Sequence, residues 1–320
     1  MKTVQTVTGE ISTDKLGFTL MHEHIFSSSM GVALSYPQLY QEGTEEKAAK
    51  DLADAKACGV DTIIDATPVG LGRDVKALKR VAEKTGMNVI ATTGWWSVEP
   101  PHAGPVPTEK WAQAFIDDAR IGCDGTDIKA GILKASMDKE GPTPWNVKMH
   151  HAVGMAQLET GMKITTHTYC PMETPRHQLR LFKEVGVDMQ NVIVGHILET
   201  TDIDFIKWVY DQGVWIGVDR MPMVHFPNEY GIPVETRLKT VRAMIDAGMA
   251  DRMLFSHDIA STSTLFDYQT PEMRAYTSGI VPEMFTFWKT VAFPKLIEMG
   301  VDPEVLQKIA VDNPKTFFEL

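Results

Sequence analysis

The segment Thr19-Leu20-Met21-His22-Glu23-His24 decides the fold of this chain, because a short apolar run ends directly in a His-x-His pair. In a strand, residues two apart face the same side, so His22 and His24 project together while Glu23 faces away. A doubly wound dinucleotide-binding sheet would carry a glycine-rich phosphate turn at this point, and none is present. The segment therefore disfavours an open sheet and favours a barrel with polar residues at its strand ends.

Seven further short apolar runs follow this first one along the chain. The eight runs are 17–21, 61–66, 88–93, 128–134, 162–167, 191–196, 214–219 and 253–258. Runs that are apolar on both faces suit parallel strands between a packed interior and covering helices. Helical stretches separate them: 44–58 and 73–84 each end near a glycine, and Pro107-Thr108-Glu109 opens a third with a capping residue followed by an acid. The pattern predicts an α/β fold, a single (β/α)₈ TIM barrel over residues 1–320, with a short N-terminal β segment at about 1–12.

Six side chains with metal chemistry fall at the carboxyl ends of these runs. They are His22 and His24 after the first run, Lys134 in the fourth, His167 in the fifth, His196 in the sixth and Asp258 in the eighth. Each alone has an ordinary explanation, such as a hydrogen-bonded rim histidine or, for Asp258, a helix cap. Their coincidence on one rim predicts a metal site, and six ligands are too many for one four-coordinate ion. We expect two divalent ions, zinc first, with manganese, cobalt or iron as alternatives.

Lys134 needs a chemical explanation, because an ammonium group cannot bind a metal and would repel two dications. The apolar neighbours Ile132, Leu133 and Ala135 indicate a buried setting, although Lys134 could also be a surface lysine whose charged end reaches solvent. Burial lowers the pKa of an amine, and a neutral amine takes up carbon dioxide to form a carbamate. That anionic group could bridge two metals about 3.5 to 4 Å apart.

Composition limits the partners. Lys and Arg number 31 and Asp and Glu 42, which gives a formal net charge of −11. This charge disfavours nucleic acid and anionic membranes as partners. No apolar run approaches the ~18 residues of a membrane-spanning helix, the N-terminus lacks a signal-peptide core, and the cysteines Cys58, Cys123 and Cys170 match no zinc or redox spacing. We expect a cytoplasmic enzyme with a small-molecule substrate.

An ordered set of motifs resembles the phosphotriesterase-like branch of the amidohydrolase superfamily. The motifs are Thr19-Leu20-Met21-His22-Glu23-His24, Gly131-Ile132-Leu133-Lys134-Ala135, Thr165-Thr166-His167-Thr168, Val194-Gly195-His196 and Phe255-Ser256-His257-Asp258. The likeness runs from Val4-Gln5-Thr6-Val7-Thr8-Gly9 to Val311-Asp312-Asn313-Pro314-Lys315-Thr316-Phe317-Phe318, almost the whole chain. It implies a binuclear metal-dependent hydrolase.

The resemblance also implies a role for each ligand. His22, His24 and Asp258 would bind the more buried metal, and His167 and His196 the more exposed one. Carbamylated Lys134 and a hydroxide would bridge the two ions. The hydroxide would attack the substrate, and Asp258 would take up the released proton. Members of the family are commonly homodimers, so a homodimer is expected by resemblance alone.

The sequence gives mixed indications about the substrate. Asp219-Arg220 matches the pair that lactonases of this family carry after the seventh strand, whereas Trp96 stands where those lactonases carry a tyrosine and looks more like the phosphotriesterases. We expect an enzyme that opens lactones or hydrolyses related esters. The alternatives are a phosphotriesterase, which hydrolyses organophosphates, or an amide or carbamate hydrolase on the same centre. A metal-binding protein without turnover is disfavoured, because a pure binder has no need of a proton acceptor such as Asp258.

Two loops follow strand ends and are candidate substrate walls. One spans 95–105 and includes Trp96; the other spans 259–281 and offers Ile259 and Phe266 as apolar wall residues. These residues could equally pack against the barrel or a partner subunit. His257 precedes Asp258 and should point away from it by strand alternation, which is typical of a structural histidine.

Overall fold

The computed structural model describes residues 2–36, 38, 43–222, 231–263 and 283–320. A nine-stranded parallel sheet in the order β10-β9-β8-β7-β6-β5-β4-β3-β11 forms its centre. The strands are β3 (Thr19–Ser27), β4 (Thr62–Asp65), β5 (Asn88–Gly94), β6 (Ile132–Ser136), β7 (Lys163–His167), β8 (Val192–Val194), β9 (Trp215–Val218), β10 (Met253–Phe255) and β11 (Ala260–Ser263). Neighbours from β3 to β10 are consecutive in the chain, as in a (β/α)₈ barrel. The predicted fold class is confirmed.

The barrel closes where the last strands meet the first. β11 pairs in parallel with β3, with Ala260 opposite His24. The Asp258 amide donates to the His22 carbonyl at 3.0 Å, and the His24 amide donates to the Ile259 carbonyl at 3.0 Å. The segment 259–281 was expected to be a loop, but it begins as a strand because these hydrogen bonds extend the barrel wall along β3.

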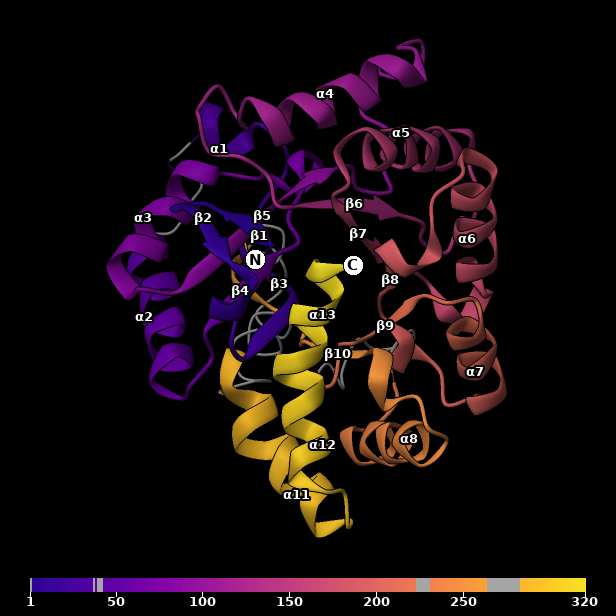
Figure 1. Cartoon of the computed structure of the whole chain (residues 1–320). Coiled ribbons are helices and arrows are strands. Elements are labelled where there is room, and N and C mark those ends of the chain that lie inside the picture. The colour runs from indigo at the N-terminus through magenta and orange to yellow at the C-terminus, as the bar shows by residue number, and fades with distance from the viewer. Residues whose placement is uncertain (1, 37, 39–42, 223–230, 264–282) are drawn as a thin grey trace.

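Helices surround the strands (Figure 1). They are α1 (Val32–Ser35), α2 (Thr44–Ala57), α3 (Val75–Thr85), α4 (Thr108–Arg120), α5 (Pro144–Thr160), α6 (Thr174–Val185), α7 (Ile203–Asp211), α8 (Val234–Asp246), α11 (Phe293–Glu298), α12 (Pro303–Gln307) and α13 (Asn313–Glu319). α3 begins two residues later than expected, because the Asp74 carboxylate accepts the Ala77 amide and caps it. α4 begins at Thr108, but no side chain caps it, so the predicted capping residue is wrong.

Both chain ends lie at the amino-terminal end of the barrel (Figure 1). There the antiparallel hairpin of β1 (Thr3–Thr6) and β2 (Gly9–Ser12) lies beside α13, and Lys2 donates to the Glu319 and Leu320 carbonyls. α13 contributes Phe317, whose ring packs 5.5 Å from that of Trp215 on β9. This end of the barrel is therefore closed by side chains from both termini.

Two apolar layers hold the strands. The interior cluster contains Val4, Leu16, Met21, Ile64, Ile90, Ile132, Ile193, Trp215, Leu254, Phe317 and Phe318. The other face of the strands, with Leu20, Ile63 and Leu133 among others, packs in a larger cluster with helical residues. The apolar character of both strand faces therefore reflects burial on both sides, as the sequence predicted.

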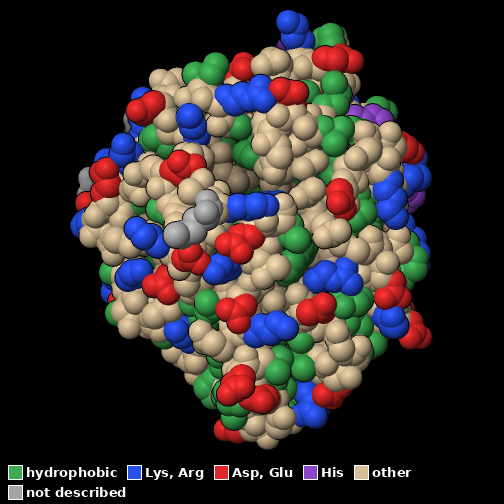
Figure 2. Space-filling model, in the orientation of Figure 1, with side chains coloured by type: hydrophobic (Ala, Val, Ile, Leu, Met, Phe, Trp, Pro, Cys, Tyr) green, Lys and Arg blue, Asp and Glu red, His purple; other side chains and the backbone are tan. Residues whose placement is uncertain are grey.

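The surface shows no concentration of one sign of charge on the face that carries the termini. Figure 2 shows acidic and basic side chains interspersed across it. Among the helices of the described residues, none combines the length and apolar character needed to cross a membrane.

Candidate metal centre

A β-bulge in β3 aims His22 into the barrel. Against β4, Leu20 lies opposite Ile63 but Glu23 lies opposite Asp65, so β3 carries one extra residue between these points. Met21 belongs to the apolar interior cluster, and its neighbour His22 places Nε2 3.0 Å from Nζ of Lys134. The bulge lets two consecutive side chains face inward, which simple alternation does not allow.

All six predicted metal residues converge at the carboxyl end of the barrel. The connecting distances are 3.0 Å from His22 Nε2 to Lys134 Nζ, 3.3 Å from His24 Nε2 to Asp258 Oδ1, 3.8 Å from His196 Nδ1 to Asp258 Oδ2 and 2.8 Å from His196 Nε2 to His167 Nδ1. The side chains of all six are buried or nearly so. Side chains from five strands and the segments that follow them therefore meet in one polar cluster.

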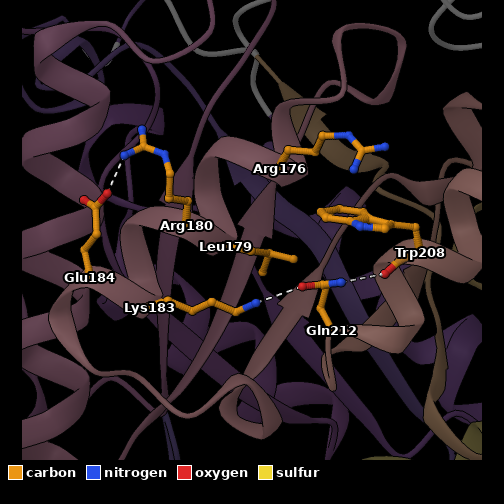
Figure 3. A pocket seen from close by; sticks show the side chains of 7 residues that line it. All are labelled: Arg176, Leu179, Arg180, Lys183, Glu184, Trp208 and Gln212. Carbon is orange, nitrogen blue, oxygen red and sulfur yellow. Dashed lines mark hydrogen bonds and ion pairs between the residues drawn. The ribbon is translucent and has the colours of Figure 1, made fainter.

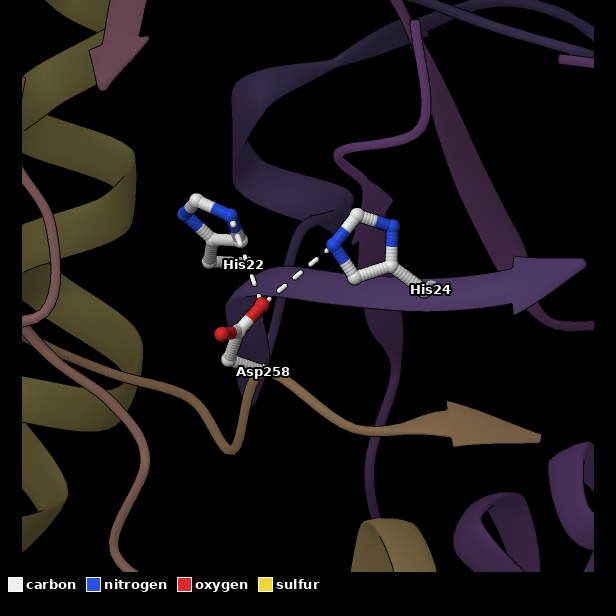
Figure 4. A group of neighbouring side chains, drawn as sticks. All are labelled: His22, His24 and Asp258. Atoms are coloured by element: carbon white, nitrogen blue, oxygen red, sulfur yellow. Dashed lines mark ion pairs between the residues drawn. The ribbon is translucent and has the colours of Figure 1, made fainter. Parts of the chain in front are cut away.

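His22, His24 and Asp258 form the first group that fits a metal ion (Figure 4). Asp258 Oδ1 lies 3.3 Å from His24 Nε2 and 3.7 Å from His22 Nε2, and one donor atom of each residue lies within 4.8 Å of the others. Figure 4 shows both rings turned toward the carboxylate. Two imidazoles and one carboxylate are a ligand set that zinc and other divalent transition metals accept.

His167 and His196 form the second pair. Nδ1 of His167 and Nε2 of His196 face each other at 2.8 Å, so a single ion between the rings could be bound by both. The described residues also contain a group of His22, His196 and Asp219 within the same 4.8 Å limit. His22 thus links the two parts of the centre.

The far nitrogen of each of the four histidines contacts an oxygen outside the six predicted residues. His24 Nδ1 lies 2.7 Å from the Thr67 hydroxyl and His196 Nδ1 lies 2.8 Å from Asp219 Oδ1. His22 Nδ1 lies 3.4 Å from the Thr165 hydroxyl, and His167 Nε2 lies 3.4 Å from Asp138 Oδ2. An oxygen acceptor on one nitrogen fixes the ring orientation and leaves the other nitrogen free to bind a metal. This arrangement is typical of metal-binding histidines.

Burial sets the protonation states that metal binding needs. Burial lowers the pKa of His22 and His196 well below the usual value, and lowers the pKa of His167 to about 4. Burial by itself would raise the pKa of Asp258, but His196 and Arg220 outweigh it and hold that pKa well below its usual range. Neutral imidazoles and an ionised carboxylate are the ligand forms.

Lys134 lies fully buried beside these ligands. Its amine donates to the Ala66 carbonyl at 2.9 Å and lies 5.6 Å from the centre of the Trp96 ring. Burial lowers the pKa of this amine to about 8, despite the opposing charge of Asp258. Gly94 precedes the Trp95-Trp96 pair, and a side chain there would collide with the Lys134 backbone. Lys134 is thus closely enclosed, with its amine directed at the cluster.

Three residues at strand ends adopt left-handed backbone conformations. The φ angles are +58° for His196, +57° for Arg220 and +57° for Asp258. Residues other than glycine rarely adopt this conformation, and it persists only where surrounding contacts enforce it. Its recurrence around one polar cluster supports a functional role for this rim.

Arg220 lies between two carboxylates. Its Nε donates to Asp258 Oδ2 at 2.7 Å, and its Nη1 donates to Glu199. Arg237 on α8 donates to the Arg220 carbonyl, at the residue that adopts the left-handed conformation. The sequence predicted Arg220 as a substrate residue, and the structure places its guanidinium against Asp258.

Trp96 lies at the edge of the cluster. Its ring centre is 4.4 Å from that of His167, with the rings nearly perpendicular. The residue is only partly buried. This position suits the predicted substrate contact.

Of the two remaining predicted substrate residues, the structure describes only Ile259. Ile259 is 8% exposed, packs in the outer apolar cluster and lies in the closing segment of the barrel. Phe266 lies outside the described residues.

Three further residues surround the cluster, because Asp219, Asp138 and Glu199 each contact a predicted site residue. The sequence singled out Asp219 only as part of the Asp219-Arg220 pair that bears on the substrate, although its position after the seventh strand also indicated the rim. Asp138 and Glu199 lie beyond strand ends, and no local pattern distinguishes them.

A cavity of about 440 Å³ lies apart from this centre, between α6 and α7 (Figure 3). Its lining includes Arg176, which lies over the Trp208 ring, and Arg180 and Lys183, which bind Glu184 and Gln212. Its cationic groups are engaged with neighbours, and none of the predicted ligands lines it.

Comparison with known proteins agrees with this geometry. The sequence profile of the phosphotriesterase family matches residues 2–318. A phosphotriesterase homology protein of Mycobacterium tuberculosis is 34% identical, with 100% of this chain and 98% of that protein covered. An aryldialkylphosphatase of Saccharolobus solfataricus is 34% identical over 96% of each chain, and an N-acetyltaurine hydrolase of Xenopus tropicalis is 26% identical over 98% of this chain and 96% of its own.

The family match covers every strand that contributes to the centre, and the His and Asp groups of the structure are compatible with the metal chemistry of that family. The comparisons bear out the family resemblance that the sequence motifs indicated. The chain is therefore a metal-dependent hydrolase and belongs to the phosphotriesterase family.

Proposed function

We propose that this protein is a binuclear metal hydrolase that opens lactones or hydrolyses related esters. His22, His24 and Asp258 would hold one divalent ion, and His167 and His196 the other. The observation that carries this proposal is the continuous cluster formed by the six predicted side chains, whose polar atoms are linked by contacts of at most 3.8 Å. Zinc is the metal that we expect for these ligands, with manganese, cobalt or iron as alternatives.

Lys134 would bridge the two ions as a carbamate formed with carbon dioxide. Its buried amine lies 3.0 Å from His22 Nε2, close to both ligand sets. As an unmodified ammonium, Lys134 would repel the ions, whereas a carbamate is anionic and adds two oxygen ligands that attract them. Lys134→Ala should therefore lose metal and activity together, and short carboxylic acids should restore part of both.

When bound, divalent ions would supply Lewis-acid chemistry, which would lower the pKa of a water molecule and polarise the substrate oxygen. The chain supplies the proton transfer: Asp258 is ionised and lies where it can accept a proton and pass it to the leaving group. Arg220 holds Asp258 Oδ2 at 2.7 Å and fixes its orientation. Trp96 provides an apolar wall beside His167 that excludes water from one side.

The Asp219-Arg220 pair supports a lactone or ester as substrate. Arg220 is already engaged by Asp258 and Glu199, so little cationic charge remains for an anionic substrate. A neutral acyl compound suits this site better than a carboxylate or phosphate monoester.

A phosphotriester is the second candidate. Trp96 packs edge-on against His167, and a relative covering 96% of this chain is named aryldialkylphosphatase. An amide or carbamate is a third, since another relative is named N-acetyltaurine hydrolase. A homodimer and a cytoplasmic location stay predictions from the sequence.

The test is metal removal followed by titration with zinc, manganese or cobalt against a panel of a lactone, an aryl ester, a phosphotriester and an N-acyl amide. We expect turnover to return at a stoichiometry near two ions per chain, with the lactone or ester hydrolysed at the highest kcat/KM. Full activity in metal-free protein would refute the mechanism. If a phosphotriester or an amide is the best substrate, the proposed metal centre stands and the proposed lactone or ester specificity is wrong.

A further inference from the structure

Glu23, which separates the two histidines of the His-x-His pair, faces away from the metal ligands and is fully buried. Its carboxylate accepts four hydrogen bonds, and every donor lies in the segment 256–259. Because Asp258 lies inside that segment, we propose that Glu23 is a positioning residue that holds Asp258 in the conformation that binds the metal. This inference rests on the proposed metal centre.

The hydrogen bonds hold the backbone on both sides of Asp258. The His257 amide donates to Glu23 Oε1 at 2.8 Å, and the Ile259 amide donates to Glu23 Oε2 at 3.3 Å. Asp258 between them has a φ of +57°. A single carboxylate therefore fixes the residues that flank a strained backbone position, which is the kind of contact that makes such a conformation persist.

The side chains of Ser256 and His257 complete the arrangement. The Ser256 hydroxyl donates to Glu23 Oε1 at 2.8 Å and accepts the His22 amide at 2.7 Å. His257 Nδ1 donates to Glu23 Oε1 at 2.6 Å, because its Nε2 accepts the Trp288 amide at 3.2 Å and must be unprotonated. Glu23 thus couples the backbone of one metal ligand, His22, to the segment that carries another, Asp258.

An amide at position 23 cannot make this set of bonds. Both carboxylate oxygens accept from N–H or O–H donors, whereas glutamine would present an NH₂ group to at least one of them. Glu23→Gln keeps nearly the same volume, so the main change is one unmatched donor facing the backbone beside Asp258. Altering a group that orients a metal ligand typically weakens metal binding about 10- to 100-fold.

The experiment is cobalt titration of the metal-free full chain, with visible absorption and chelator competition as readouts. The variant is Glu23→Gln. Asp118→Asn is the matched control, because Asp118 also accepts from two side chains, Arg73 and Thr93, but contacts none of the residues in 256–259. We expect Glu23→Gln to weaken one of the two cobalt sites about 10-fold or more and to change the absorption bands of that site. The control should bind two ions as the unchanged protein does.

Two cobalt ions bound by Glu23→Gln with unchanged affinity and spectrum would overturn the positioning role and leave the metal centre standing. An unchanged protein that binds no metal would instead refute the proposed function. If Glu23→Gln does not fold, Ser256→Ala decides the question, since it removes one of the four donors; a weakening confined to one site supports the proposal, and unchanged binding overturns it.

Discussion

The two halves of the barrel interior are filled by opposite kinds of side chain, although the same strands supply both. β6 contributes Ile132 to the apolar half and Lys134 to the polar half. β10 contributes Leu254 to the apolar half, and Asp258 follows it in the polar half. Burial of apolar surface stabilises the fold, whereas burial of ligands costs free energy unless they are paired. On these two strands, the residue that stabilises the apolar half lies two or four positions before the residue that we propose for metal binding.

The largest expected effect lies in the polar half. Asp258→Asn should lower kcat by about 10² to 10⁴, because an amide cannot accept a proton and binds metal poorly. The fold should persist, since the volume hardly changes. The measurements are kcat at saturating metal and the Tm of the same sample. A near-normal kcat would mean that Asp258 only packs at the rim and that the polar half is not the site of chemistry.

A substitution in the apolar half should have the opposite result. Ile132→Ala removes a fully buried side chain from the interior cluster and should lower the free energy of unfolding by about 2 to 5 kcal/mol. Its kcat per folded molecule should stay close to that of the unchanged protein. Urea unfolding with active-site titration measures both. Ile121→Ala is the control, because Ile121 is 68% exposed and its loss should change stability by less than about 0.5 kcal/mol.

His150 is a buried histidine outside the barrel interior, and it should make the stability of the fold depend on pH independently of the metal residues. His150 on α5 donates from Nδ1 to the Asn146 carbonyl and accepts from Gln178 at Nε2, and burial lowers its pKa to about 4. Because the unfolded chain takes up this proton near pH 6.5, the stability contribution is complete above that value and is lost as the pH falls toward 4.

His150→Gln should therefore reduce the loss of stability between pH 7.5 and pH 5 by about 2 kcal/mol relative to the unchanged protein. Urea unfolding of both proteins at the two pH values, with metal present, tests this. The difference between the two proteins isolates His150 from the metal ligands. Equal pH dependence would mean that His150 is already protonated or exposed in the native state.

The smallest expected effect concerns specificity at the mouth of the polar half. Trp96→Tyr adds a hydroxyl beside His167 and should raise the ratio of lactone to phosphotriester kcat/KM about tenfold, the change that one hydrogen bond to developing charge can supply. Trp111→Tyr is the control, because Trp111 packs against Trp95 and Trp145. If both variants leave the ratio unchanged, Trp96 does not contact the substrate.

The barrel was predictable from the sequence, and so was the convergence of the six predicted metal residues on one rim. Eight apolar runs with helical stretches between them specify parallel strands, and parallel strands bring their carboxyl ends to one rim. His22, Lys134, His167 and Asp258 could therefore be placed together without any contact being known. The bounds of α2 and α3 were predicted to within two residues, since local periodicity and glycine stops act over a few residues.

The contacts that orient these six residues became known only from the folded chain. The bulge in β3 is defined by the pairing of β3 with β4. The hydrogen bonds from residues 256–259 to Glu23 join segments more than 230 positions apart in the sequence. The ion pairs of the Arg220 guanidinium with Asp258 and Glu199 were likewise not predictable from the sequence, and its contact with a substrate stays a prediction. Sequence patterns report periodicity along one segment, whereas these contacts arise between segments that meet only when the barrel closes, so their geometry had to come from the folded chain.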